Sequence, residues 1–321
     1  MKISAISLYS LCLLLLSLGV QGLYAQMGVI GQYPMLLGHY NAASIGFGDE
    51  LSLTALHTRQ LEGVEGSSKA FVVMADMPLM FLGHRHGVGV ELTSTTFGLF
   101  KDTSLAARYA FGIGLGQLGR LQLGAGMRLV TSVFDGTKVF VPLGIEGMSS
   151  VDGAIPAVEV SGRGIDAQIG AYYRYRNIDL GIGVNNLLGA TILLGNKYKR
   201  EHVRSYNLFA RYAIGIDRIA LRFEPSVIFE ATEALLYRLD LRLGVWYKKL
   251  VYMAGMYRPG QAWGANLGVR IGKVYLGYQF ERPTSELGRG SWGNHELLLC
   301  YSMPIDVGGK KNKKYKSIQL L

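Results

Sequence analysis

The sequence has little charge, few cysteines and prolines, and almost no long apolar run, and each shortage excludes or disfavours a class of protein. Charged residues make up 17% of the 321 residues, against about a quarter in an average soluble chain. Two cysteines cannot staple a chain of this length, which excludes a disulfide scaffold. The 8 prolines disfavour a disordered chain rich in proline and glycine. After the N-terminus there is no uncharged apolar run of about 18 residues, which argues against a helical membrane protein.

The chain is instead rich in apolar residues, glycine and tyrosine. Hydrophobic residues are 49% of the total, and there are 43 glycines, 19 tyrosines and a formal net charge of +10. A membrane β-barrel combines a high apolar content with the absence of a membrane-spanning helix. The composition therefore favours a membrane β-barrel.

The N-terminus has the three parts of a secretory signal peptide. Lys2 precedes an apolar run over 3–20, and small or polar residues then lead to Ala25. This order predicts a signal peptide over 1–25 that is cleaved before Gln26, with an uncleaved anchor helix as the alternative. Cleavage would leave Cys300 as the only thiol, in a protein that has crossed a bacterial inner membrane or entered another secretory route.

From residue 50 onward the apolar residues recur with a period of two, as in a β-strand that buries one face. Over 237–247 the odd-numbered positions are apolar or aromatic, whereas the even-numbered ones include Arg238, Asp240 and Arg242. We predict about fourteen such strands, mostly long enough to cross a membrane when tilted. Their expected ranges are 50–59, 68–77, 86–96, 102–112, 119–131, 164–176, 177–186, 205–214, 217–229, 236–247, 250–258, 262–271, 273–281 and 293–302.

The connections between these strands are short on one side and long on the other. The long ones are 132–163, 187–204 and 282–292, and all follow odd-numbered strands. Outer-membrane barrels have short periplasmic turns and long external loops. The prediction is an all-β fold, a transmembrane antiparallel β-barrel over 50–303, with an N-terminal periplasmic segment at 26–49 and a basic periplasmic tail at 304–321.

Charged residues dominate the face expected to point inward, and tyrosines mark the ends of the outward face. The inward set is Arg108, Arg128, Arg174, Arg211, Arg222, Arg238, Arg242 and Arg270 with Asp166, Asp179, Glu224, Asp240 and Glu281. Either they form ion pairs that fill the lumen, which we favour, or they line a charged channel that prefers anions. The outward set, interpreted as an interfacial girdle, is Tyr109, Tyr173, Tyr206, Tyr237, Tyr247 and Tyr301.

Signatures of catalysis and of metal or cofactor binding are missing from the sequence. It contains no phosphate loop, no His-Glu-x-x-His and no cysteine pair at metal spacing. We interpret His84 and His86 as solvated turn residues, and His295 beside Glu296 has no nucleophile placed with it. The prediction is a protein without catalytic, cofactor-binding or metal-binding residues.

Several short motifs, in this order and spacing, resemble the PorP/SprF family, outer-membrane components of the type IX secretion system of Bacteroidetes. Ala42 and Leu61 stand where that family typically has proline and tryptophan. The motifs are Gln32-Tyr33, Asn41 to Gly46, Arg59 to Gly63, Ala75 to Pro78, His86 to Val90, Gly277 to Pro283 and Gly293 to Leu297.

The resemblance implies a role in type IX secretion in the outer membrane and, in gliding species, in delivering surface adhesins. It also implies binding of cargo proteins through C-terminal sorting domains and contact with periplasmic and membrane-ring components. Loops 132–163 and 187–204 are the expected cargo surface, unless they only cap the barrel. The alternatives are an outer-membrane channel for small or hydrophobic solutes and a structural anchor for a surface filament.

The C-terminal tail contains five lysines between residues 310 and 316. Such a run is expected to be solvated, and either it only solubilises the terminus or it docks on an acidic partner or an anionic lipid surface. Nucleic acid is not an expected partner in this compartment.

Overall fold

A computed structural model describes residues 30–139, 155–195 and 198–306. The predicted signal peptide at 1–25, part of loop 132–163 and the lysines of the tail lie outside these residues.

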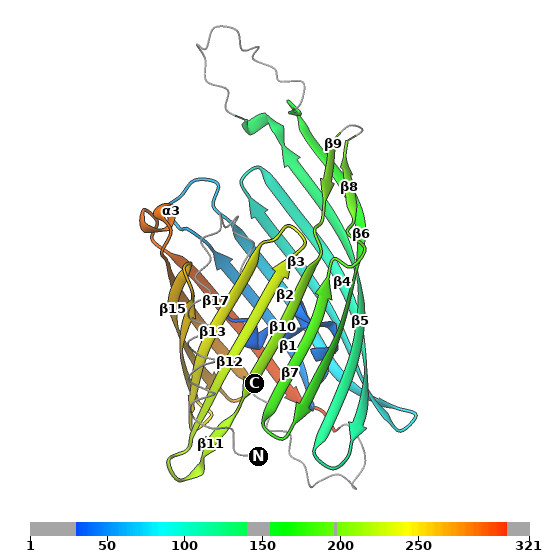
Figure 1. The fold of residues 1–321 in the computed structure, drawn as a ribbon, viewed down its shortest axis with the longest axis vertical. Coiled ribbons are helices and arrows are strands. Elements are labelled where there is room, and N and C mark those ends of the chain that lie inside the picture. The colour runs from blue at the N-terminus through cyan, green and yellow to red at the C-terminus, as the bar shows by residue number, and fades with distance from the viewer. Residues whose placement is uncertain (1–29, 140–154, 196–197, 307–321) are drawn as a thin grey trace.

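The described chain forms one closed antiparallel barrel (Figure 1). Strands β1 to β7 and β11 to β17 pair with their sequence neighbours, β1 pairs with β17, and β10 pairs with both β7 and β12, which completes the ring. The first half comprises β1 (Glu50–Arg59), β2 (Lys69–Phe81), β3 (His84–Phe97), β4 (Phe100–Leu115), β5 (Gly119–Asp135), β6 (Glu159–Tyr175) and β7 (Ile178–Asn185). The second comprises β10 (Ser205–Tyr212) with β11 (Ile214–Ile216), β12 (Leu221–Thr232), β13 (Tyr237–Tyr247), β14 (Val251–Arg258), β15 (Ala262–Ile271), β16 (Val274–Pro283) and β17 (Asn294–Pro304).

Strands β10 and β11 lie end to end and both pair with β12, so together they occupy one position in the ring. The barrel therefore has fourteen strand positions around its circumference. The break falls at Ala213, opposite Glu224 and Pro225 in the shared register. Proline has no N–H to donate to the ladder, which accounts for an interruption here. The fold class predicted from the alternation is confirmed, and two of the fourteen ranges, 50–59 and 262–271, match to the residue.

The outward and inward faces of the barrel wall differ in burial, as the alternation of apolar and polar residues along each strand requires. Outward residues such as Leu129, Ile182 and Leu267 are exposed, whereas inward neighbours such as Asp240 and Gln279 are almost fully buried. None of the helices in the described part of the chain is long and apolar enough to span a membrane. The exposed apolar residues on the outer face of the strands form the surface that meets lipid.

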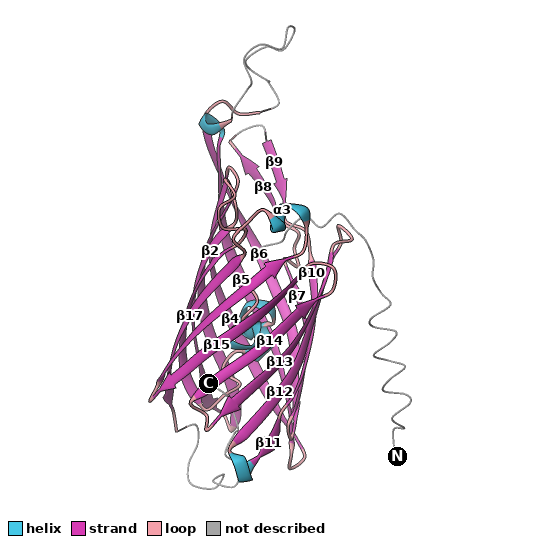
Figure 2. Ribbon diagram, turned by 90° about the vertical axis from the view of Figure 1, so that its left-hand side faces the viewer, coloured by secondary structure: helices cyan, strands magenta, loops and turns pink. Residues whose placement is uncertain are grey.

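The N-terminal segment lies inside the barrel (Figure 2). It carries three short turns of helix, η1 (Tyr33–Met35), α2 (Leu37–Tyr40) and η2 (Ala42–Ser44). Tyr33 and Ala43 are completely buried, although neither belongs to a strand. We expected 26–49 to be a separate periplasmic segment, and its described part, 30–49, instead fills the lumen. We call residues 30–49 the plug.

The external end of the barrel is taller on one side than on the other. β4, β5 and β6 rise beyond the level of the loop that contains α3 (Glu286–Arg289), and η3 (Gly136–Lys138) follows β5 (Figures 1 and 2). Loop 187–204 folds into a hairpin of β8 (Thr191–Leu194) and β9 (Tyr198–Glu201) that packs against β6. At the opposite end η4 (Asp217–Ile219) sits in the turn before β12.

Candidate functional site: the plugged lumen and the external crown

The start of the plug is held by charged side chains of the wall. The backbone N–H groups of Gly31 and Gln32 donate to the two carboxylate oxygens of Glu296 at 2.7 and 3.0 Å. Arg242 donates to the carbonyl of Gly31 at 2.7 Å and to the Gln279 side chain at 2.8 Å. Hydrogen bonds with an ionised partner are roughly twice as strong as neutral ones. This end of the plug is therefore anchored to two strands, β13 and β17, and Gln279 of β16 supports Arg242.

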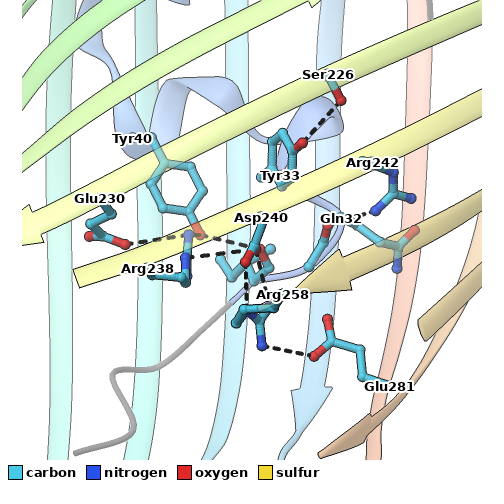
Figure 3. Close-up of polar contacts among 12 residues, drawn as sticks. Gln32, Tyr33, Tyr40, Ser226, Glu230, Arg238, Asp240, Arg242, Arg258 and Glu281 are labelled. Carbon is cyan, nitrogen blue, oxygen red and sulfur yellow. Dashed lines mark hydrogen bonds and ion pairs between the residues drawn. The ribbon is translucent and has the colours of Figure 1, made fainter. Parts of the chain in front are cut away.

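Two tyrosines of the plug bind side chains of β12 and β13 (Figure 3). The Tyr33 hydroxyl lies 3.0 Å from the hydroxyl of Ser226. The Tyr40 hydroxyl donates to the carbonyl of Ile30 at 3.3 Å and accepts from Arg238 at 3.3 Å. The first residue of η1 and the last residue of α2 are thus bound to β12 and β13. The hydroxyl groups of these two buried rings therefore have hydrogen-bond partners.

Asn41 fixes the middle of the plug to β6 and β7. Its side-chain amide donates to the carbonyls of Ala171 and Ile182 at 2.9 and 3.1 Å. Its oxygen accepts from the N–H of Ala43 at 2.9 Å, which caps η2. A Cβ on Gly170 would lie 2.0 Å from that oxygen, so the wall position opposite Asn41 requires glycine.

The end of the plug runs along the base of the β2–β3 hairpin. Gly46 donates its N–H to Asp76 at 2.7 Å, and Gln122 donates to the carbonyl of Ile45 at 2.6 Å. The Arg120 guanidinium donates to the carbonyl of Phe47 and stacks over its ring, 3.7 Å from the centroid. Polar side chains of the wall therefore bind the backbone of the plug along its whole length.

Ion pairs between wall residues fill the space that the plug leaves. Asp240 is fully buried and receives Arg258 at 2.5 Å and Arg238 at 3.7 Å (Figure 3). Arg238 also pairs with Glu230, and Arg258 with Glu281, each at 3.3 Å. These contacts agree with the interpretation that inward charges form ion pairs rather than line an open channel. The pairs join residues of the same strand or of strands one or two places apart, however, and not residues on opposite sides of the lumen as we expected.

Further charged pairs of the predicted set occur around the ring. Arg174 and Arg211 both bind Asp179, Arg222 lies 2.7 Å from Glu224, and Arg108 lies 3.1 Å from Glu91. The sequence prediction omitted several inward charges that the structure brings into these networks. They are Arg85, Glu91, Arg120, Glu230, Arg258 and Glu296, which the same alternation applied to each strand would have found.

A hydrophobic cluster lies at the external end of the barrel, under the β8–β9 hairpin. Ile192 and Leu194 of β8 pack with Val130 of β5, and Phe100, Phe134, Val160 and Tyr198 surround them. Arg200 of β9 binds Asp102 at 2.5 Å and stacks over Phe100, 4.6 Å from its centroid. We call this hairpin with the external ends of β4, β5 and β6 the crown.

The crown is rigid at its base and apolar on its surface. Leu193 and Val158 are exposed, although the residues beside them belong to the packed cluster. Burial lowers the pKa of the His202 imidazole, which favours its neutral form next to the hairpin. A loop surface held by a second core in this way is suited to binding another protein.

The histidines noted in the sequence have structural partners. His86 is nearly buried, against our expectation of a solvated turn residue, because the rings of Phe81, Tyr109 and Phe111 pack around it. Its ring nitrogens contact the Tyr109 hydroxyl at 2.6 Å and the Phe81 carbonyl at 3.1 Å. His295 contacts the Tyr278 hydroxyl on the outer face, so it points away from Glu296. The described residues contain no group of three or more side chains that could hold a metal ion.

A closed antiparallel barrel with an apolar outer face and a polar, filled lumen defines a bacterial outer-membrane β-barrel protein. The chain matches the family described as "Type IX secretion system membrane protein PorP/SprF" over residues 23–301. It therefore belongs to the PorP/SprF family, and it is an outer-membrane component of the type IX secretion system.

Solved structures of similar outline are outer-membrane barrels of other families. The Ralstonia pickettii toluene transporter TbuX is 12% identical, with 86% of this chain and 94% of that chain covered and a TM-score of 0.48. A Pseudomonas aeruginosa FadL homologue is 8% identical, with 82% and 91% covered and a TM-score of 0.44. The translocator domain of the autotransporter NalP from Neisseria meningitidis is 11% identical, with 79% and 86% covered and a TM-score of 0.41. No protein of curated function matches the chain significantly.

Proposed function

We propose that this secretion component acts by recognition, binding or presenting secreted cargo and contacting periplasmic secretion-ring proteins. The observation that supports recognition over passage is the plug. Its backbone is bound by Glu296, Arg242, Gln122 and Asp76, and buried ion pairs occupy much of the remaining lumen. A solute channel would need a continuous open path through the lumen, which a segment bound from 30 to 49 obstructs.

The crown is the proposed cargo surface. It stands on the external side, its base is fixed by the Ile192 cluster, and it exposes Leu193 and Val158 to solvent. Protein interfaces have an apolar centre surrounded by polar residues, and Lys199 and Glu201 of β9 supply such a rim. The proposed action is non-enzymatic: the protein holds a folded sorting domain and changes no covalent bond.

The experiment compares two apolar-to-polar variants in cells that depend on this protein for secretion. Leu193→Ser with Val158→Ser alters the crown surface, and Leu235→Ser alters an equally external turn on another part of the rim. We expect the crown variant to lose cargo capture by pull-down and to deplete the medium and cell surface of cargo, with the barrel still at normal abundance. Loss of secretion with both variants, or with neither, would contradict a cargo site on the crown.

If the protein instead conducts small or hydrophobic solutes, we expect the opposite results for conductance and cargo binding. Planar bilayers should then show solute-specific conductance in the wild-type protein, and cargo should not bind. A surface-filament anchor would differ from both, because its loss would impair motility and leave secretion intact.

A further inference from the structure

The periplasmic turns of the barrel carry an excess of positive charge. Solvent-exposed cations occur in four of them, and Asp217 is the one acidic residue in the six turns that join β2 to β3, β4 to β5, β6 to β7, β11 to β12, β13 to β14 and β15 to β16. The cations are Arg176, Arg218, Lys248, Lys249 and Lys273. We call the four turns that hold them the basic turns.

Two of these cations lie over tyrosines of the lipid-facing surface. The Arg176 guanidinium lies 5.4 Å from the centroid of the Tyr175 ring, and the Lys248 ammonium lies 5.2 Å from that of Tyr247. Both rings are exposed on the outer face of the wall. Tyrosines of such barrels sit at the level of the lipid headgroups. The two charges are therefore held at the membrane edge of the rim and not over the lumen.

An exposed apolar side chain lies one or two residues from a cation in or beside each basic turn. Ile219 follows Arg218 and Leu250 follows Lys249, whereas Ile178 lies two residues after Arg176 and Ile271, at 74% exposure, lies two residues before Lys273. A fully hydrated rim would leave these residues in water. At the boundary between headgroups and acyl chains, the apolar residue enters the lipid while the long basic side chain extends to the phosphate level.

The backbone of the basic turns favours residues other than those present. Arg176, Lys248 and Lys249 have φ values of 52°, 51° and 57°, in the left-handed region. Glycine occupies this region at no steric cost, and asparagine at less cost than lysine or arginine. Forming the turns does not require cationic side chains at these three positions. Their presence therefore points to a role of the side chains in binding.

We propose that the basic turns bind the headgroups of anionic phospholipids in the periplasmic leaflet of the outer membrane. The partner is a phospholipid of net negative charge, recognised by charge at the phosphate and by apolar contact below it. This interaction is separate from cargo binding on the crown and does not depend on it.

The test uses the mature protein in detergent, titrated with phosphatidylglycerol or with phosphatidylcholine, and native mass spectrometry to count bound lipids. The variant is Arg176→Gln with Lys248→Gln and Lys249→Gln, which removes three charges and keeps a Cβ at each turn position. The matched control, Lys69→Gln with Lys101→Gln and Arg289→Gln, removes three exposed cations from the external end.

We expect the wild type and the control to prefer phosphatidylglycerol about tenfold, and the turn variant to lose that preference. High salt should weaken the preference, since the contact is electrostatic. Equal binding of the two lipids by the wild type would overturn the proposal. So would an equal loss in both triple variants. An acidic periplasmic protein as the true partner would appear as a cross-linked complex lost in the turn variant while the lipid preference persists, which also contradicts it.

Discussion

The lumen face and the lipid face of the barrel are built from alternate residues of the same strands, yet different partners complete them. On β13, Arg238, Asp240 and Arg242 face the lumen and bind other residues of this chain. Leu241 and Leu243, between and beside them, face outward and have lipid as their partner. The lumen face is specific, because these charges bind particular side chains and backbone groups. The lipid face requires only apolar surface of sufficient height.

This difference determines how a substitution acts. A change on the lumen face leaves a charge or a carbonyl buried without its partner, and the cost is set by that one group. A change on the lipid face alters transfer into hydrocarbon, and its cost depends on depth. Three pairs of variants separate these cases, ordered by expected effect.

The largest effect is expected for Asp240→Asn, since it removes the charge between two buried arginines. Breaking a buried ion pair by altering one partner costs about 3–5 kcal/mol. The control is Glu233→Gln in the exposed pair of Arg204 and Glu233, where we expect about 1 kcal/mol or less. The free energy of unfolding in urea, measured in lipid vesicles, provides the comparison. Equal losses at the two sites would remove the distinction between buried and exposed charges.

The next effect concerns the lipid face. Leu267→Arg places a charge in the middle of β15, where the side chain is exposed to lipid, and should cost about 2–4 kcal/mol. Leu235→Arg makes the same change in the external turn between β12 and β13, and it should leave stability unchanged. Urea unfolding again measures both. A neutral Leu267→Arg would mean that this part of β15 does not contact hydrocarbon.

The smallest effect is expected at a single contact with the plug. Gln122→Ala removes the donor to the buried carbonyl of Ile45 and should cost about 1–3 kcal/mol. The matched control, Gln117→Ala, lies in the exposed turn before β5. Hydrogen exchange of the amides of 43–49 is the more sensitive measurement, because loosening of the plug is local. Unchanged exchange in Gln122→Ala would show that this bond does not hold the plug.

The strands could be predicted from the sequence because each carries the period of two over about ten residues. The β8–β9 hairpin could not, since two strands of 4 residues are too short to show that period inside a loop. The plug gave no signal either. Asn41 contacts Ala171 and Ile182, more than a hundred residues away, and nothing near Asn41 in the sequence specifies those partners.

The glycines illustrate the same limit. Their abundance indicated a barrel, but only the structure shows that Gly124 and Gly170 are small because the plug backbone and Asn41 pass against them. The sequence predicted that charged residues face the lumen, but it did not predict which of them form ion pairs. Pairing depends on the order and register of neighbouring strands around the ring, which alternation along one strand does not contain.

The most direct test of the central claim, that the plug closes this barrel, is its conductance in planar bilayers. A Cβ on Gly124 would lie 2.4 Å from the backbone nitrogen of Ala43, and one on Gly170 would lie 2.0 Å from Asn41, so Gly124→Val with Gly170→Val should expel the plug. Gly114→Val is the control, because no atom lies within 4 Å of its Cβ position. We expect no conductance from the wild type or from Gly114→Val, and we expect the double variant to conduct. Steady conductance by the wild type, equal to that of the double variant, would contradict it.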